Sequence, residues 1–194
     1  MTSNQFSRDG QKTITINRLS RNADGVWARE EIPADVPMAN GGINHSDGIL
    51  FCSQGNATSP PGLIHMTSTR PYRTRTLINN YHGRRFNSPN DVIIARDGSI
   101  WFTDPIYGYE QGICPKPELP NQVYRYDPSS GDIRAVADGF GRPNGLAFSP
   151  DGETLYVTDT DWMHGDGSTD DTRVSSMYVS IGDWRHSATA NRRV

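Results

Sequence analysis

The chain has 194 residues and a formal net charge of −3 at pH 7. This charge gives no electrostatic basis for binding nucleic acid or an anionic membrane, and no apolar run approaches the roughly 20 residues of a membrane-spanning helix. The length allows a sizeable core in one domain or an elongated array of repeats. We therefore expect a protein whose partners are neither nucleic acids nor membranes.

The cysteine content and the N-terminal residues bear on the compartment. Two cysteines, Cys52 and Cys114, are too few for a disulfide framework. The first 20 residues contain no apolar segment of the kind found in a signal peptide. Both features favour a cytoplasmic location.

Short runs rich in valine, isoleucine, tyrosine and tryptophan alternate with turns rich in glycine and proline, which is typical of an all-β protein. In chain order, residues 12–32 predict a hairpin, residues 40–55 two strands and residues 62–78 a second hairpin. The same succession follows at residues 90–105 with 121–138, and again at 144–160 with 175–194.

The three pairs of strands begin in the same way. Each starts with asparagine and reaches Asp-Gly in its last two positions: "NGGINHSDG" (40–48), "NDVIIARDG" (90–98) and "NGLAFSPDG" (144–152). Repeats of about 40–50 residues with four short strands are typical of β-propeller blades. We expect a β-propeller domain over residues 1–194, with blades at about 38–80, 88–138 and 142–194 and the tail of a preceding blade at 12–32.

The ends of this array would leave strand edges open. Propellers close into rings of about 4–8 blades, which protects those edges. The sequence predicts about three blades and part of another. We therefore expect a partial propeller, and self-association through its open edges is one hypothesis.

The repeated asparagines Asn40, Asn90 and Asn144 each stand where an inner strand begins. Inner strands line the central channel of a propeller, so these side chains are expected to meet at its mouth. Amide oxygens are hard ligands that suit Ca²⁺ when carboxylates join them. The alternative is that each is a turn residue whose side chain bonds its own backbone. Asn87, just ahead of Asn90, raises the same question.

Two further signals lie in the loop after the third repeat. Residues 159–171 contain five aspartates, which indicate either a second cation site or a solvated acidic loop. They do not match the spacing of an EF-hand. His164, two residues after Trp162, belongs either to a pocket rim or to the surface.

Two long stretches resemble a known family. "RRFNSPNDVIIARDGSIWFTDP" (84–105) and "GFGRPNGLAFSPDGETLYVTDT" (139–160) are similar to the SMP-30/gluconolactonase/LRE-like family, in its gluconolactonase-type branch. Residues 37–56, 104–112 and 120–128 extend the resemblance over nearly the whole chain. The resemblance implies a six-bladed β-propeller of calcium-dependent lactone hydrolases. The chain would then lack the first and last blades.

The resemblance also implies roles for individual residues. Asn144 matches a ligand of the divalent ion, and Asn90 matches a residue beside the ion that contacts substrate, the oxyanion or bound water. Arg85 is the nearest match to a substrate-contacting arginine, and Asn40 is the other expected substrate contact. The expected ion is Ca²⁺, with Zn²⁺, Mn²⁺ or Mg²⁺ as alternatives. The glutamate ligand and the general-base aspartate of the family have no counterpart in this chain.

Two functions follow as alternatives. The first is metal-dependent hydrolysis of a sugar lactone or related cyclic ester, impaired by the two missing carboxylates, with a small-molecule lactone as the partner. The second is a non-catalytic propeller piece that serves as a binding or interaction module. The sequence leaves open whether the chain is an enzyme.

Overall fold

The computed structural model describes residues 2–8, 11–181 and 192–193. This part of the chain forms antiparallel sheets and one short helix, α1 (Tyr107–Glu110). The first sheet contains β1 (Thr2–Arg8), β2 (Gln11–Arg21) and β3 (Trp27–Ile32). The second contains β4 (Ala39–His45), β5 (Gly48–Ser53), β6 (Gly62–Thr67) and β7 (Thr74–Ile78).

Two more four-stranded sheets and a small hairpin follow. The third sheet contains β10 (Val92–Ile94), β11 (Ile100–Asp104), β12 (Gln122–Tyr126) and β13 (Ile133–Ala137). The fourth contains β14 (Pro143–Phe148), β15 (Thr154–Thr160), β16 (Ser175–Ile181) and β17 (Arg192–Arg193). Strands β8 (Asn80–Tyr81) and β9 (Arg84–Arg85) pair with each other between the second and third sheets.

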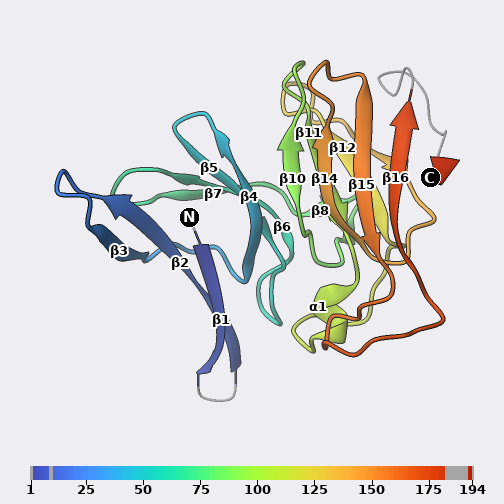
Figure 1. Ribbon diagram of the computed structural model, residues 1–194, viewed down its shortest axis with the longest axis horizontal. Helices are drawn as coiled ribbons and strands as arrows, with labels where there is room; N and C mark the ends of the chain where they lie inside the picture. The colour runs from blue at the N-terminus through green and yellow to red at the C-terminus, as the bar shows by residue number, and fades with distance from the viewer. Residues whose placement is uncertain (1, 9–10, 182–191, 194) are drawn as a thin grey trace.

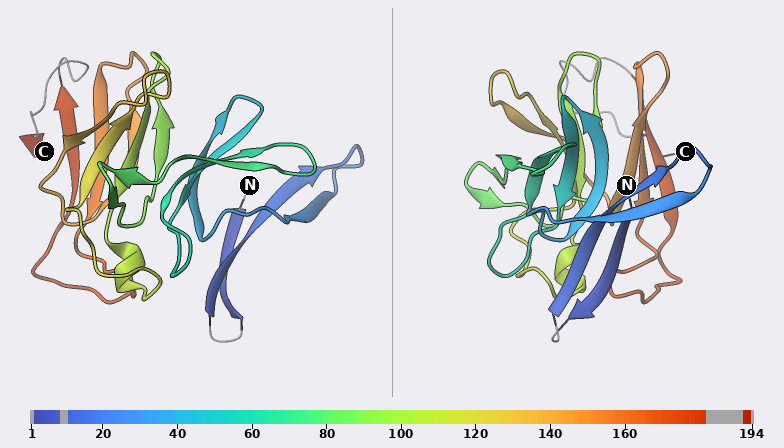
Figure 2. Two further views of the ribbon diagram at one scale, coloured as in Figure 1. Left: turned by 180° about the vertical axis from the view of Figure 1, so that it is seen from behind. Right: turned by 90° about the vertical axis from the view of Figure 1, so that its left-hand side faces the viewer.

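The sheets are arranged as the blades of a propeller. Within each sheet the strands lie in chain order and pair antiparallel with their neighbours. The first strands of the three four-stranded sheets, β4, β10 and β14, lie next to one another (Figure 1). The views in Figure 2 show the same order of sheets around this inner side. The all-β propeller expected from the repeats is confirmed, whereas the number of blades in a complete ring stays a prediction.

The repeat pattern did not predict β1. This strand pairs with β2, from Thr2 opposite Asn17 to Arg8 opposite Gln11. Its sequence, TSNQFSR, has a single large apolar residue and therefore no alternating pattern that could have indicated a strand.

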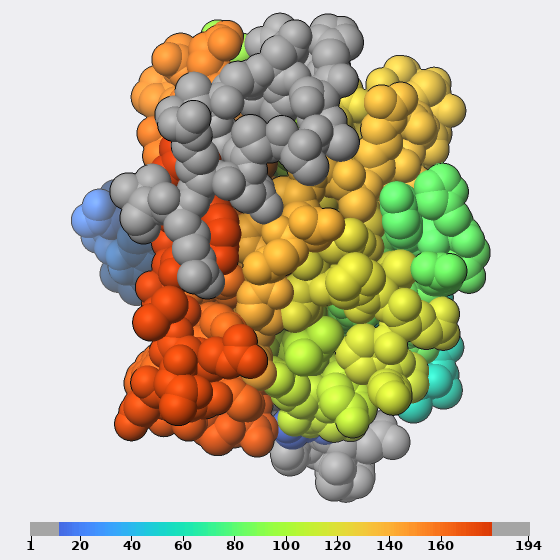
Figure 3. Space-filling view, turned by 90° about the vertical axis from the view of Figure 1, so that its right-hand side faces the viewer, coloured from blue at the N-terminus to red at the C-terminus, as the bar shows by residue number. Residues whose placement is uncertain are grey.

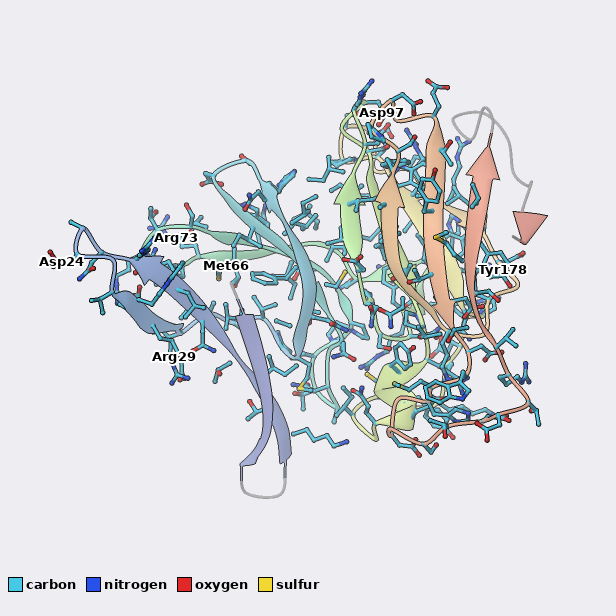
Figure 4. The ribbon with its side chains drawn as sticks, in the orientation of Figure 1. Asp24, Arg29, Met66, Arg73, Asp97 and Tyr178 are labelled. Carbon is cyan, nitrogen blue, oxygen red and sulfur yellow. The ribbon has the colours of Figure 1, made fainter. Side chains whose placement is uncertain are left out.

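Each gap between neighbouring sheets holds its own apolar cluster. Strand β11 shows why, because Phe102 belongs to the cluster toward the second sheet and Trp101 to the cluster toward the fourth. Successive side chains of a strand point to opposite faces, so a blade between two others is buried on both. A third apolar cluster fills the gap between the first and second sheets. Figure 4 shows Met66, one of its members, in that gap.

Close contacts between inner strands fix how the sheets meet. The Gly41 N–H donates to the Asn90 carbonyl at 2.8 Å, and a Cβ on Gly41 would lie only 2.5 Å from that oxygen. Glycine at this position therefore allows β4 and the start of β10 to approach each other. On the other side, the Leu146 N–H donates to Asp91 Oδ2 at 3.1 Å. Thr103 Oγ1 donates to the Asn144 carbonyl at 2.6 Å.

Within the described residues, no helix has the length and apolar character needed to cross a membrane.

Candidate active site

Two buried aspartates hold the chain just ahead of the third and fourth inner strands. Asp104, at the end of β11, accepts hydrogen bonds from the N–H groups of Asn87 at 2.9 Å and Ser88 at 2.8 Å. Asp159, near the end of β15, accepts from Gly141 at 2.9 Å and Arg142 at 2.6 Å. Both carboxylates hold the backbone that leads into a repeated asparagine.

Asn87 and Asn90 turn out to have different roles. The Asn87 side chain is 4% exposed and donates to the carbonyls of Asp104 at 3.2 Å and Pro120 at 3.3 Å. Asn87 therefore has a structural role, but its side chain bonds carbonyls 17 and 33 residues further along the chain and not the backbone of its own turn. The Asn90 side chain is partly exposed and makes no hydrogen bond to the described residues, so its amide is available to a ligand.

The three repeated asparagines line one cavity of about 620 Å³. It lies at the α1 end of the sheets, where the inner strands begin, whereas the turn that carries Asp97 lies at the opposite end (Figure 4). Figure 3 shows α1 and the loop after β15 side by side at this end. The other described lining residues come from several elements: Ile14, Ala39, Gln54, Tyr107, Gln111, Thr160, Trp162, Met163, His164, Gly165, Gly167 and Ser175.

A hydrogen-bond network holds Asn144 against the cavity wall. Asn144 Nδ2 donates to Thr160 Oγ1 at 3.4 Å, and the Thr160 hydroxyl also bonds the hydroxyl of Tyr107. Burial raises the pKa of Tyr107, although the bonds from Thr160 and Asn144 oppose this, so the phenol is neutral near pH 7. Asn144 is therefore held by its neighbours, whereas Asn40 and Asn90 are not tied by their side chains to described residues.

An ion-pair cluster attaches the loop after β15 to α1. Arg142 is 8% exposed, and its guanidinium bonds the Glu110 carboxylate at 2.6 Å and Asp161 at 2.8 Å. The Gly165 N–H also donates to Glu110, at 2.6 Å. Burial alone would raise the pKa of Glu110, but the bonds from Arg142 and Gly165 outweigh it and lower that pKa. The cluster thereby holds the segment that carries Trp162, Met163 and His164 into the cavity wall.

The carboxylates of the acidic loop bond donors of the protein itself. Asp166 and Asp170 accept the N–H groups of Ser168 and Thr172 within their own turns, each at 2.9 Å. Asp161 is paired with arginine. Among the described residues, no group of three or more His, Cys, Asp or Glu side chains is placed to hold a metal ion. The loop's carboxylates therefore stabilise its own fold.

Arg85 is the predicted site residue that lies apart from the others. Its guanidinium donates to the carbonyls of Asn56 at 2.8 Å and Ser59 at 3.5 Å, and it does not line the asparagine cavity. The family resemblance made Arg85 the nearest match to a substrate-contacting arginine, but these carbonyls hold its guanidinium away from the asparagine cavity. A contact between Arg85 and substrate stays a prediction.

Several lining residues were not singled out from the sequence. Tyr107 and Gln111 come from α1 and its C-terminal cap, and Thr160 follows Asp159 directly. Gln54 could have been found from the repeats. It follows β5 directly, and it occupies the repeat position that Asp104 holds at the end of β11. His164 and Trp162 line the cavity, so the pocket-rim interpretation of His164 is the correct one.

The donor set in the cavity can be compared with what a divalent cation requires. Asn90 and Asn144 offer neutral amide oxygens, which are suitable hard ligands. Such an ion also requires carboxylate charge, and the described lining residues include no aspartate or glutamate. By themselves these residues do not fit a divalent cation.

Comparison with known proteins identifies relatives over most of the chain. It is 35% identical over 163 residues to lactonohydrolase oryL of Aspergillus oryzae, an alignment that covers 80% of this chain and 37% of the relative. It is 36% identical over 139 residues to a gluconolactonase of Zymomonas mobilis, covering 68% of this chain and 37% of the relative. The chain thus spans little more than a third of these two curated relatives.

A solved gluconolactonase structure from Xanthomonas campestris has the same fold. It superposes with a TM-score of 0.68 at 29% identity, covering 95% of this chain and 59% of that protein. The model of the family described as "SMP-30/Gluconolactonase/LRE-like region" matches residues 9–174. This chain therefore belongs to the SMP-30/gluconolactonase/LRE-like family.

Proposed function

We propose that this chain supplies the substrate cavity of a hydrolase that opens a sugar lactone or a related cyclic ester. One observation carries the proposal: asparagines from three sequence repeats, Asn40, Asn90 and Asn144, line the same cavity. The relatives named lactonohydrolase and gluconolactonase support this choice of reaction.

The chemistry assigns a separate task to each asparagine. Water adds to the ester carbonyl, and the tetrahedral adduct then breaks its bond to the ring oxygen, which gives an open-chain hydroxy acid. The free amide of Asn90 is suited to donate to the developing oxyanion. Asn144 is held by Thr160 and forms a fixed polar wall, whereas Asn40 is free to bond substrate hydroxyl groups.

Dependence on a metal ion is a separate part of the proposal. Asn144 and Asn90 are the residues that we propose as ligands, and Ca²⁺ is the proposed ion, with Zn²⁺, Mn²⁺ or Mg²⁺ as alternatives. The described lining residues do not complete such a site, because they bring no carboxylate. A positioned general base is usually worth about 10²–10⁴ in rate, so we propose that turnover by this chain is impaired.

The same feature supports the second candidate function. A cavity lined by amides and hydroxyls, with no carboxylate among its described residues, can bind a polar ligand without hydrolysing it. In that case the chain is a binding module, and its ligand is bound and released unchanged.

Titration of the acid released from glucono-δ-lactone in a pH-stat tests the proposal. We expect the purified chain to exceed spontaneous hydrolysis. Changing Asn90→Ala is expected to lower kcat by about 10²–10³, the usual effect of losing one oxyanion donor.

Asn80→Ala is the matched control, because Asn80 is exposed in β8 and does not line the cavity. It should leave kcat and KM unchanged. Hydrolysis no faster than the spontaneous rate, together with saturable binding of the lactone, would support the binding module instead.

A further inference from the structure

One side chain in the wall of the asparagine cavity has the chemistry of a base near neutral pH. Among the described lining residues, only Tyr107 and His164 carry a titratable group. Burial raises the pKa of Tyr107, so its phenol stays neutral and is not a base at that pH. An imidazole, in contrast, ordinarily changes its charge between about pH 5 and 8. His164 is therefore the described lining residue that can accept a proton.

The turn that carries His164 is fixed against α1. The His164 N–H donates to the Ser168 carbonyl at 2.9 Å, which closes the turn. The N–H of the next residue, Gly165, donates to the Glu110 carboxylate at 2.6 Å. A Cβ on Gly165 would lie only 2.8 Å from the Tyr107 carbonyl oxygen, so the turn lies directly on the helix. The position of the imidazole therefore rests on an anchored backbone.

One edge of the imidazole faces a carboxylate. The Nδ1 atom of His164 lies 4.0 Å from Glu110 Oε1. The Glu110 side chain is 13% exposed, and Arg142 and the Gly165 N–H hold it in place. The distance exceeds that of a hydrogen bond, but catalytic hydrogen bonds are often long in free enzymes and tighten when substrate binds. A carboxylate beside Nδ1 favours the tautomer with its proton on Nδ1, which leaves the lone pair on Nε2.

The other ring nitrogen is free to act. Among the described residues, none is hydrogen-bonded to His164 Nε2, and the side chain is 32% exposed in the cavity wall, so water can reach the ring. The carboxylates of Asp166 and Asp170, in the same loop, also attract a protonated imidazole, as Glu110 does. Arg142, the partner of Glu110, opposes them. These surroundings can stabilise the imidazolium that forms when His164 takes a proton.

We infer that His164 is the general base of this cavity and that Glu110 is its positioning residue; this rests on the proposed function. The Nε2 atom takes a proton from water while the water oxygen bonds the lactone carbonyl carbon, whose π electrons move onto the carbonyl oxygen. The bond to the ring oxygen then breaks, and the imidazolium gives its proton to that oxygen. One water is consumed, one hydroxy acid is released and the imidazole is neutral again. His164 thereby restores part of the rate that the missing carboxylate base would cost.

The pH dependence of glucono-δ-lactone hydrolysis by His164→Gln tests the inference. After subtraction of the spontaneous rate, kcat of the wild type is expected to rise between about pH 5 and 8, as the imidazole loses its proton. In the variant, kcat should fall by about 10² or more, KM should stay within roughly twofold, and the rise should be lost. His82→Gln is the matched control, because His82 is exposed and does not line the cavity. It should behave as the wild type does.

Two further measurements separate a chemical role from a structural one. Free imidazole should restore activity to His164→Ala in proportion to its concentration, and it should not stimulate His82→Ala. Glu110→Gln keeps an acceptor oxygen for the Gly165 N–H but removes the charge beside the imidazole. Because a carboxylate stabilises the imidazolium, the rise of kcat should move to lower pH in Glu110→Gln. Thermal denaturation checks folding, and His164→Asn replaces His164→Gln if the latter does not fold.

The outcomes distinguish this inference from the proposed function. Wild-type turnover that persists in His164→Gln with the same rise would overturn the inference alone and assign the rise to another group, such as Asp104, whose pKa burial raises to about 7. Activity lost in His164→Ala and not restored by imidazole would also overturn it. A wild-type rate no higher than the spontaneous one would overturn both the base and the hydrolysis. An unmoved rise in Glu110→Gln would refute the role of Glu110.

Discussion

At the scale of single residues, Asp104 couples the fold to pH. Burial raises its pKa from the usual value of 3.8 to about 7, although the N–H groups of Asn87 and Ser88 oppose the rise. A folded-state pKa above the unfolded one means that the folded chain binds this proton more tightly. The resulting contribution to stability is fully present below about pH 4 and is lost as pH rises through about 7.

The variant Asp104→Asn is expected to be less stable and less sensitive to pH. The amide has one acceptor oxygen for two backbone N–H groups, so the free energy of unfolding should fall by about 1–3 kcal/mol. Urea denaturation at about pH 5 and about pH 8 should show a smaller pH effect than in the wild type. An unchanged pH effect would contradict this assignment. Asp132→Asn, in an exposed turn, is the control.

At the scale of elements, the cavity wall depends on contacts between α1 and the loop after β15. Arg142 joins them through Glu110 and Asp161. No regular secondary structure links these two segments, so the positions of Trp162 and His164 depend on this ion-pair cluster. Sequence periodicity carries no signal for such a contact, so the sequence left open whether His164 lies at a pocket rim or on the surface.

Changing Arg142→Met should separate the loop from α1. It leaves the Glu110 carboxylate without its arginine partner in a largely buried place, whereas Asp161 keeps its pair with Arg173. Removing one partner of a buried ion pair typically costs about 3–5 kcal/mol. Denaturant titration measures this loss, and faster proteolysis within residues 161–173 would locate it. Arg134→Met is the control, because the Arg134–Asp132 pair is exposed and worth at most about 1 kcal/mol. Equal losses in the two variants would refute the role of the cluster.

At the scale of the whole molecule, the repeats predicted the propeller and the meeting of the three asparagines. Strand alternation and Asp-Gly turns are local signals, and their common register placed Asn40, Asn90 and Asn144 at one end of the sheets. The position of Arg85 and the place of Gln111 in the cavity wall depend on packing between segments far apart in the chain, which no local pattern records. Self-association through open strand edges stays a prediction.

The central claim is that the asparagine cavity opens a lactone ring. Its most direct test compares the initial rate of glucono-δ-lactone hydrolysis by the wild-type chain and by Asn144→Ala, with and without a chelator. We expect the wild type to exceed the spontaneous rate. In the variant, the rate above the spontaneous one is expected to fall by a factor of about 10² or more. A loss on chelation, restored by Ca²⁺, would support the proposed ion. A variant as active as the wild type would contradict the account.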